Sequence, residues 1–173
     1  MTDSSGRYSG VLTSNVITPV QPEPVAFAVF SADDSSLNFY KRPNVPEAGT
    51  RFEGKTATEV YTGIETNRWF GYERPWDSRS ASIWSTKVVD VIQPEYTTSW
   101  FKDCSNLISV DLRKLDTSNV KKIDQMFWDC SSLRTLDVSG FNTGNVDTMA
   151  SMFHGCSNLV ELDVSGFNTS NVY

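Results

Sequence analysis

Hydrophobic positions in the C-terminal part of the chain repeat with a fixed spacing of 26 residues. Phenylalanine recurs at Phe101, Phe127 and Phe153, and other residue types keep the same spacing without drift. They are Cys104, Cys130 and Cys156; Leu107, Leu133 and Leu159; Asp111, Asp137 and Asp163; and Asn119, Asn145 and Asn171. A fixed period of this length, with apolar residues in register, predicts a repeat protein in which each unit stacks on the one before it.

Two periodicities within one repeat predict a strand and a short helical turn. Leu159, Leu162 and Val164 are expected to point inward from a strand whose intervening polar residues point outward. Met149 and Phe153 have the i, i+4 spacing of a helical turn, which would close the coil. The expected fold class is therefore α+β, with a short leucine-rich-repeat-type solenoid of parallel strands, one per 26-residue coil.

The recurring motifs are F-x-x-C-S-x-L, then L-D-V-S-G-F-N-T, then N-V, and together they span residues 100–173. This combination resembles the 26-residue variety of the BspA-like leucine-rich repeat family. The resemblance implies a bacterial surface or secreted protein with an adhesive role, and it implies no catalysis. Residues 25–99 resemble, more loosely, the module that precedes such repeats.

The rest of the chain divides into two segments before these repeats. Residues 1–24 are rich in Ser, Thr, Gly and Pro, which is typical of a flexible lead or linker. Residues 25–99 are expected to form a β-rich aromatic cap module. Its strand candidates are a hairpin of 26–30 and 37–40, a further segment at 56–64, and a degenerate first rung at 86–91.

This division gives each end of the stack a different expected environment. The cap module would cover the apolar edge of the first coil. The third copy stops at Tyr173, short of a full unit, so further repeats in the natural protein, or self-association through an uncapped C-terminal coil, are expected. No secretion signal or wall anchor is recognisable in the chain, which suggests a fragment of a longer protein.

Charge and hydropathy exclude some classes of partner. The 173 residues carry a formal net charge of −6 and have a sequence pI of about 4.7, so neither nucleic acid nor an anionic membrane surface is an expected partner. No apolar run has the length of a membrane span, so membrane insertion is not expected either.

The cysteine and asparagine columns are best interpreted as structural. The three cysteines occupy equivalent positions without a C-x-x-C pair, so free buried thiols are expected in place of disulfides or a metal site. Asparagine amides within a turn can bond to backbone groups of their own and the neighbouring coil. No metal and no other cofactor is predicted.

Outward positions supply the candidate binding residues. Asp111, Asp137 and Asp163 form an acidic column with Glu161 beside it, and either loop hydrogen bonds or a cation would offset their repulsion. The positions that vary between copies are a column of Lys102, Trp128 and His154 and a column of Ile108, Arg134 and Val160. Trp128 could anchor a partner or fold against the neighbouring coil.

A cluster of aromatic residues and arginines before the repeats could stack on sugars. Its candidate binding residues are Trp69, Tyr72 and Trp76, and Trp84 lies nearby. The alternative is that these rings fill the core of the module, since large aromatic side chains rarely stay exposed in numbers.

The function expected from these features is recognition of a protein or glycan by a non-catalytic scaffold at the bacterial cell surface or outside the cell. The alternative is a structural spacer that presents another domain. An enzyme such as a glycoside hydrolase is not favoured, because the chain has a single histidine and none of the common catalytic motifs.

Overall fold

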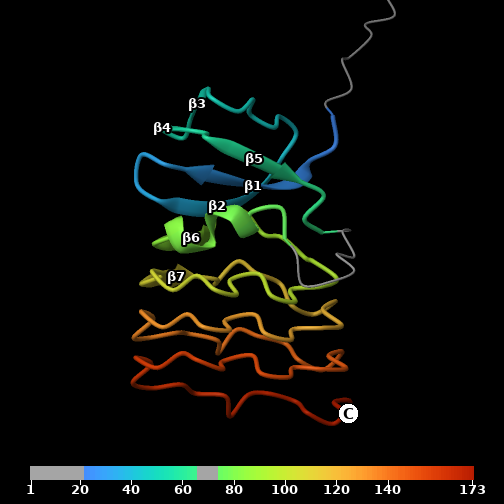
Figure 1. The fold of residues 1–173 in the computed structure, drawn as a ribbon. Helices are drawn as coiled ribbons and strands as arrows, with labels where there is room; N and C mark the ends of the chain where they lie inside the picture. The colour runs from blue at the N-terminus through green and yellow to red at the C-terminus, as the bar shows by residue number, and fades with distance from the viewer. Residues whose placement is uncertain (1–21, 66–73) are drawn as a thin grey trace, which may run out of the picture.

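The computed structural model describes residues 22–65 and 74–173, in which a five-stranded sheet covers one end of a stack of coils (Figure 1). The strands of this sheet are β1 (Val25–Ser31), β2 (Ser36–Arg42), β5 (Glu59–Thr62), β6 (Ser85–Val88) and β7 (Ser109–Asp111). Their order is β5-β1-β2-β6-β7. A separate hairpin of β3 (Arg51–Phe52) and β4 (Lys55–Thr56) lies above the sheet, and a 3-10 helix, η1 (Asp77–Ser82), precedes β6.

The antiparallel half of the sheet confirms the predicted hairpin. β1 pairs with β2 from Val25 opposite Arg42 to Ser31 opposite Ser36. The turn between them ends at Ser35, whose φ of 54° is left-handed. Both faces of β1 are covered, because alternate residues enter two separate apolar clusters. Its near-continuous apolar sequence follows from this position.

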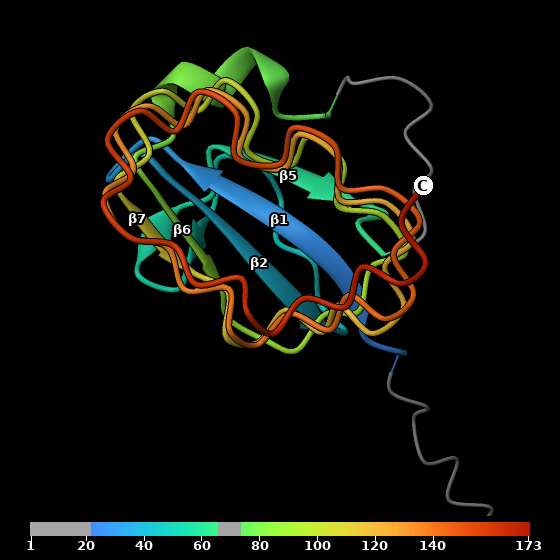
Figure 2. The same cartoon turned by 90° about the horizontal axis from the view of Figure 1, so that it is seen from below.

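The parallel half of the sheet begins the stack. β6 pairs in parallel with β2 and with β7, and Thr86 lies opposite Val110 in the second pairing. Of the segment 86–91, in which a first rung was expected, residues 86–88 belong to β6. Below β7 the remaining coils lie one beneath another, and their outlines nearly coincide when viewed along the stack (Figure 2).

The predicted α+β solenoid of parallel strands is wrong. The described residues are mostly β, with one mixed sheet of five strands, one small hairpin, and a single 3-10 helix as the helical content. Past β7, the described coils consist of turns and bends joined by isolated parallel bridges, such as Thr135 with Glu161 and Lys122 with Thr148. The helical turn expected around Met149 to Phe153 is absent from this region, which forms hydrogen-bonded turns.

Left-handed residues explain why helices do not form. Ser99, Gln125 and Ser151 recur every 26 residues with φ of 59°, 54° and 55°, and an α-helix cannot continue through such a residue. The backbone N–H groups of these turns donate to the next coil instead, as Gln125 does to the Ala150 carbonyl at 3.0 Å. The i, i+4 spacing of apolar residues therefore reflects inward positions on a turn.

Side-chain caps explain why the outer segments are not continuous strands. Asp137 accepts the N–H of Ser139 at 3.0 Å, and Asp163 accepts the N–H of Ser165 at 2.8 Å. Each bond bends the chain locally and uses a donor that a strand ladder would need. The Ser-Gly pair that follows each aspartate then turns the chain.

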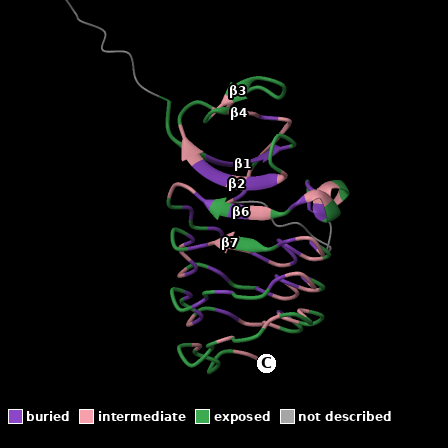
Figure 3. Ribbon diagram, turned by 90° about the vertical axis from the view of Figure 1, so that its left-hand side faces the viewer, coloured by how far each residue is buried: buried purple, intermediate pink, exposed green. Residues whose placement is uncertain are grey.

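One core runs from the sheet through the stack. The Phe39 ring from β2 stacks on Trp100 with centroids 4.8 Å apart, and Phe101 stacks on Phe127 at 5.4 Å. Phe127 stacks in turn on Phe153 at 6.0 Å. Burial decreases toward the last coil (Figure 3). The opposite face of the sheet carries a second, smaller cluster of Phe27, Val29, Tyr40 and Ala57.

Two predicted features lie outside the described residues. They are most of the flexible lead at 1–24, and the aromatic positions Trp69 and Tyr72. Among the residues that the structure does describe, no helix has the length and apolar character needed to cross a bilayer.

Candidate functional site

Lys102, Trp128 and His154 form a stacked column on the lateral surface of the coils. The Lys102 Nζ atom lies 5.7 Å from the centroid of the Trp128 ring, which is within cation–π range. The His154 ring lies 4.1 Å from Trp128 with an interplanar angle of 30°. The structure therefore brings these three predicted site residues together.

Trp128 makes contacts within the chain on several sides. Its indole N–H donates to the Asp129 carboxylate at 2.9 Å, while the neighbouring coils supply Lys102 and His154. The ring is partly buried, and His154 is the exposed member of the column. Of the two sequence-based interpretations of Trp128, the packing favours a tryptophan folded against neighbouring coils.

The aspartate column is held mainly by local hydrogen bonds and one ion-pair cluster. Asp111 is bonded by Arg113 at 2.8 and 2.9 Å and lies 3.7 Å from Lys87. Hydrogen bonds from Arg113 hold the pKa of Asp111 well below its ordinary value. Hydrogen bonds from the side chain and backbone of Ser139 likewise lower the pKa of Asp137.

Asp163 has the corresponding environment one coil further on. Hydrogen bonds from Ser165 lower its pKa, so this carboxylate is ionised at neutral pH, as is that of Asp137. The hydrogen-bond account of the column is therefore the one that the geometry supports. Within 22–65 and 74–173, no cluster of three or more His, Cys, Asp or Glu side chains could hold a metal ion.

A shallow groove of about 410 Å³ runs across the β7 segment and the two coils below it. Its lining residues come from consecutive coils: Ile108, Ser109, Val110, Thr135, Leu136, Asp137, Glu161 and Asp163. We call this feature the acidic groove. Bridges join Thr135 to Glu161, but β7 is the edge strand of its sheet and the described residues contain no bridge from it to the next coil. The groove lies where the ladder is interrupted.

The cysteine column is structural, as the sequence predicted. All three thiols are free, with Cys104 and Cys130 buried and Cys156 partly buried. The Cys130 thiol donates to the Phe101 carbonyl at 3.1 Å, and Cys156 donates to Phe127 at the same distance. Burial raises the pKa of Cys104 to about 12, so little reactive thiolate is present at neutral pH.

Trp76 is not a surface binding residue. It is fully buried, its indole N–H donates to the Trp100 carbonyl at 2.8 Å, and its ring packs edge-on against Phe39. The predicted role of Trp76 in contacting a ligand is therefore wrong, because aromatic packing between the sheet and the first coil requires this ring.

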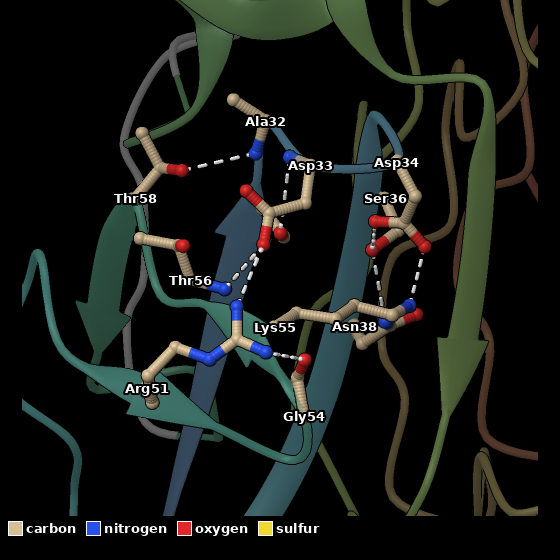
Figure 4. Close-up of polar contacts among 11 residues, drawn as sticks. Ala32, Asp33, Asp34, Ser36, Asn38, Arg51, Gly54, Lys55, Thr56 and Thr58 are labelled. Carbon is tan, nitrogen blue, oxygen red and sulfur yellow. Dashed lines mark hydrogen bonds and ion pairs between the residues drawn. The ribbon is translucent and has the colours of Figure 1, made fainter.

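A second depression of about 210 Å³ lies between the sheet and the β3–β4 hairpin. Of its charged lining residues, Lys55 pairs with Asp34 (Figure 4). Beside the depression, Asp33 accepts the N–H of Thr56 at 2.7 Å. Arg51 reaches both Asp33 and the Gly54 carbonyl. These contacts fix the hairpin onto the β1–β2 turn, and we assign them a structural role.

The sequence did not identify Trp84 as a candidate binding residue, and it did not predict the acidic groove. Trp84 was grouped with rings expected to fill the core, yet its side chain is 50% exposed. Its N–H donates to the Ser35 carbonyl, and its own carbonyl accepts from Ile108 at 2.9 Å. The outward position of Trp84 follows from the register of the sheet, in which Trp84 precedes β6 as Ile108 precedes β7, and the sequence alone did not reveal this register.

A family model matches the stacked coils, but its description assigns no function. Residues 95–173 match the family described as "Mycoplasma protein of unknown function, DUF285". No match was found among curated proteins or among solved structures.

Proposed function

We propose that this chain is a non-catalytic binding scaffold that recognises a protein or a glycan. The observation that carries the proposal is the contrast between inward and outward positions of successive coils. Inward positions keep the same residue, as Phe101, Phe127 and Phe153 do, and stack on one another. Lateral positions change from lysine to tryptophan to histidine while the backbone beneath them is unchanged. A constant frame with varied surface side chains suits recognition.

The chemistry of the potential nucleophiles also favours a binding role. The His154 ring stacks on Trp128, while the neighbouring Cys156 directs its thiol to the Phe127 carbonyl. Burial raises the pKa of Cys156, which lowers its reactivity. This pair therefore lacks the geometry of an activated Cys-His nucleophile.

A location at the exterior of a bacterial cell is part of the proposal. It is supported by the resemblance of the repeat motifs to BspA-like leucine-rich repeats. Detection of the native protein on intact cells by antibody labelling, compared with permeabilised cells, would check this location.

The binding role is tested with arrays of host proteins and glycans probed with the folded chain. We expect at least one ligand whose binding is lost when the lateral column is changed by Trp128→Ala and His154→Ala, or when the acidic groove is changed by Glu161→Lys. Asn119→Ala is the control, because its exposed side chain makes no hydrogen bond among the described residues. Absence of any ligand would contradict the proposal and favour a structural spacer.

A further inference from the structure

An exposed apolar column lies beside the acidic groove. Trp84, Ile108 and Val160 have exposed fractions of 50%, 56% and 84%, so their apolar side chains face solvent. Ile108 donates its N–H to the Trp84 carbonyl at 2.9 Å, and Val160 donates to Arg134 at 3.1 Å. Because the repeat places Arg134 between Ile108 and Val160, these four residues occupy one outward position on successive coils. We call them the outer column.

Tryptophan and arginine are the residue types most enriched at the energetic centres of protein interfaces. In the outer column they alternate with two aliphatic side chains along the stack axis. Rungs about 4.8 Å apart give the four positions a length of about 14 Å, which corresponds to about four residues of extended chain. The column is therefore matched in length to a short extended segment.

The charge of the adjacent groove indicates which charge the partner must carry. Asp137, Glu161 and Asp163 are exposed carboxylates, and none of them has an ion-pair partner within the described part of the chain. Arg134 is the nearby cation of the outer column. Lys87 and Arg113, at the upper end of this face, interact with Asp111, and the charge of Arg113 also acts on Asp137 and helps to lower its pKa. The lower part of the face thus keeps an excess of negative charge.

We propose that the outer column and the acidic groove together bind an extended protein segment in which basic residues alternate with apolar residues. Apolar side chains of the segment would cover Trp84, Ile108 and Val160, and its lysine or arginine side chains would lie against Asp137, Glu161 and Asp163. Alternation is required because successive side chains of an extended segment point to opposite sides. This inference rests on the proposed binding function and names its partner.

The test measures fluorescence anisotropy of a labelled short peptide in which lysine alternates with valine, added to the folded chain. We expect saturable binding that weakens as salt is raised, because exposed charges are screened. Glu161→Lys should reduce the affinity about tenfold, and Val160→Ser several-fold, with larger effects on dissociation than association for the apolar change. Peptides that alternate glutamate with valine, or lysine with serine, should bind at least about tenfold more weakly.

Matched controls separate this face from general surface effects. Glu47→Lys makes the same charge change at an exposed position outside the groove, and Val91→Ser removes a valine that is 59% exposed outside the groove lining. Both should leave the affinity within about twofold of the wild type. Because Val160 is 84% exposed, loss of folding is not the expected cause of weakened binding, and circular dichroism of each variant would verify this.

The outcomes distinguish this inference from the function on which it rests. Failure of the wild-type chain to bind the lysine-valine peptide, or equal binding by Glu161→Lys, would overturn the inference. If the arrays then yielded a glycan, or a protein held by the Lys102, Trp128 and His154 column, the binding function would remain supported. Failure of both the peptide and the arrays would overturn both. A concentration-dependent increase in mass without peptide that Glu161→Lys abolishes and Glu47→Lys does not would show that a second copy occupies the face, which would also overturn the inference.

Discussion

Left-handed backbone conformations recur at single residues along one edge of the stack. Asp103, Asp129 and Gly155 are equivalent positions, with φ of 60°, 56° and 75°. Aspartate and glycine tolerate this region better than most residues, because glycine has no Cβ and aspartate can bond locally. At Gly155 a second requirement applies, since a Cβ atom would lie 1.8 Å from the Asp129 Oδ1 atom. With Asp129 in its observed position, this edge therefore accommodates only glycine in the third copy.

Gly155→Ala should consequently lower the free energy of unfolding. We expect a loss of about 1 to 3 kcal/mol, because the methyl group must displace the Asp129 side chain and the backbone must keep an unfavourable φ. Gly140→Ala is the control, since Gly140 has no atom within 4 Å of an added Cβ and no left-handed φ. Urea unfolding followed by circular dichroism measures both. A Gly155→Ala variant as stable as the control would contradict the packing at this edge.

At the residue scale, inward positions were predictable and outward ones were only partly so. The cysteine column was predicted as free buried thiols because three equivalent small apolar residues, with no partner motif, suit a packed interior. For Trp76 both a binding position and a core position were considered, because composition alone does not say which side of a short module a ring occupies. It is buried because its indole N–H donates to the Trp100 carbonyl and its ring packs edge-on against Phe39.

Side-chain amides connect consecutive coils at the scale of the structural element. Asn145 donates to the Ser118 carbonyl and Asn171 donates to the Gly144 carbonyl, both at 2.7 Å. Asn158 makes an equivalent bond to Ser131 at 2.7 Å at another corner of the coil. Each amide satisfies a backbone acceptor of the preceding coil where no strand ladder is available to do so. The structural role predicted for the asparagine column is therefore supported for its second and third members.

Replacement of Asn145 by alanine should destabilise the stack modestly. We expect a loss of about 0.5 to 1.5 kcal/mol, the usual net contribution of one hydrogen bond, because this exposed carbonyl can be hydrated after the change. Asn119→Ala should have a smaller effect, since the described structure gives that side chain no hydrogen bond. Thermal unfolding of the two variants provides the comparison. Equal losses would show that the amide bond between coils contributes little.

The elements themselves were predictable where local pattern and tertiary pairing agree. The β1–β2 hairpin follows from two apolar segments around an Asp-Asp-Ser turn. The first rung was expected at 86–91, whereas β6 spans Ser85–Val88 and pairs with β7 through its first three residues. The coil turns were not predictable, because a period of 3.6 in apolar positions also arises when a turn with a left-handed residue points two side chains inward. The left-handed φ of 55° at Ser151 could not be predicted from the sequence, since serine rarely adopts this conformation.

At the scale of the whole molecule, the sheet and the coils share one apolar core. The cluster extends from Ala26 in β1 to Val146 and Met152 in the lower coils. The contacts that join the two parts are aromatic: Phe39 stacks on Trp100 and meets Phe101 edge-on at 6.1 Å. Trp76 closes the same junction by packing against Trp100 at 6.2 Å. Since these side chains are fully buried, neither part can unfold without exposing the other.

This shared core predicts a single unfolding transition. Tryptophan fluorescence reports on the junction through Trp76 and Trp100 and on the coils through Trp128, while far-ultraviolet circular dichroism reports on the backbone, so the two signals should change together on heating. Phe39→Ala should lower both midpoints equally and cost about 3 to 5 kcal/mol, because it leaves a cavity between Trp76 and Trp100. Val25→Ala, at a side chain that is 46% exposed, should cost less than about 0.5 kcal/mol. Two separated transitions in the wild type, or a Phe39→Ala variant in which only one signal shifts, would show that the sheet and the coils are independent units.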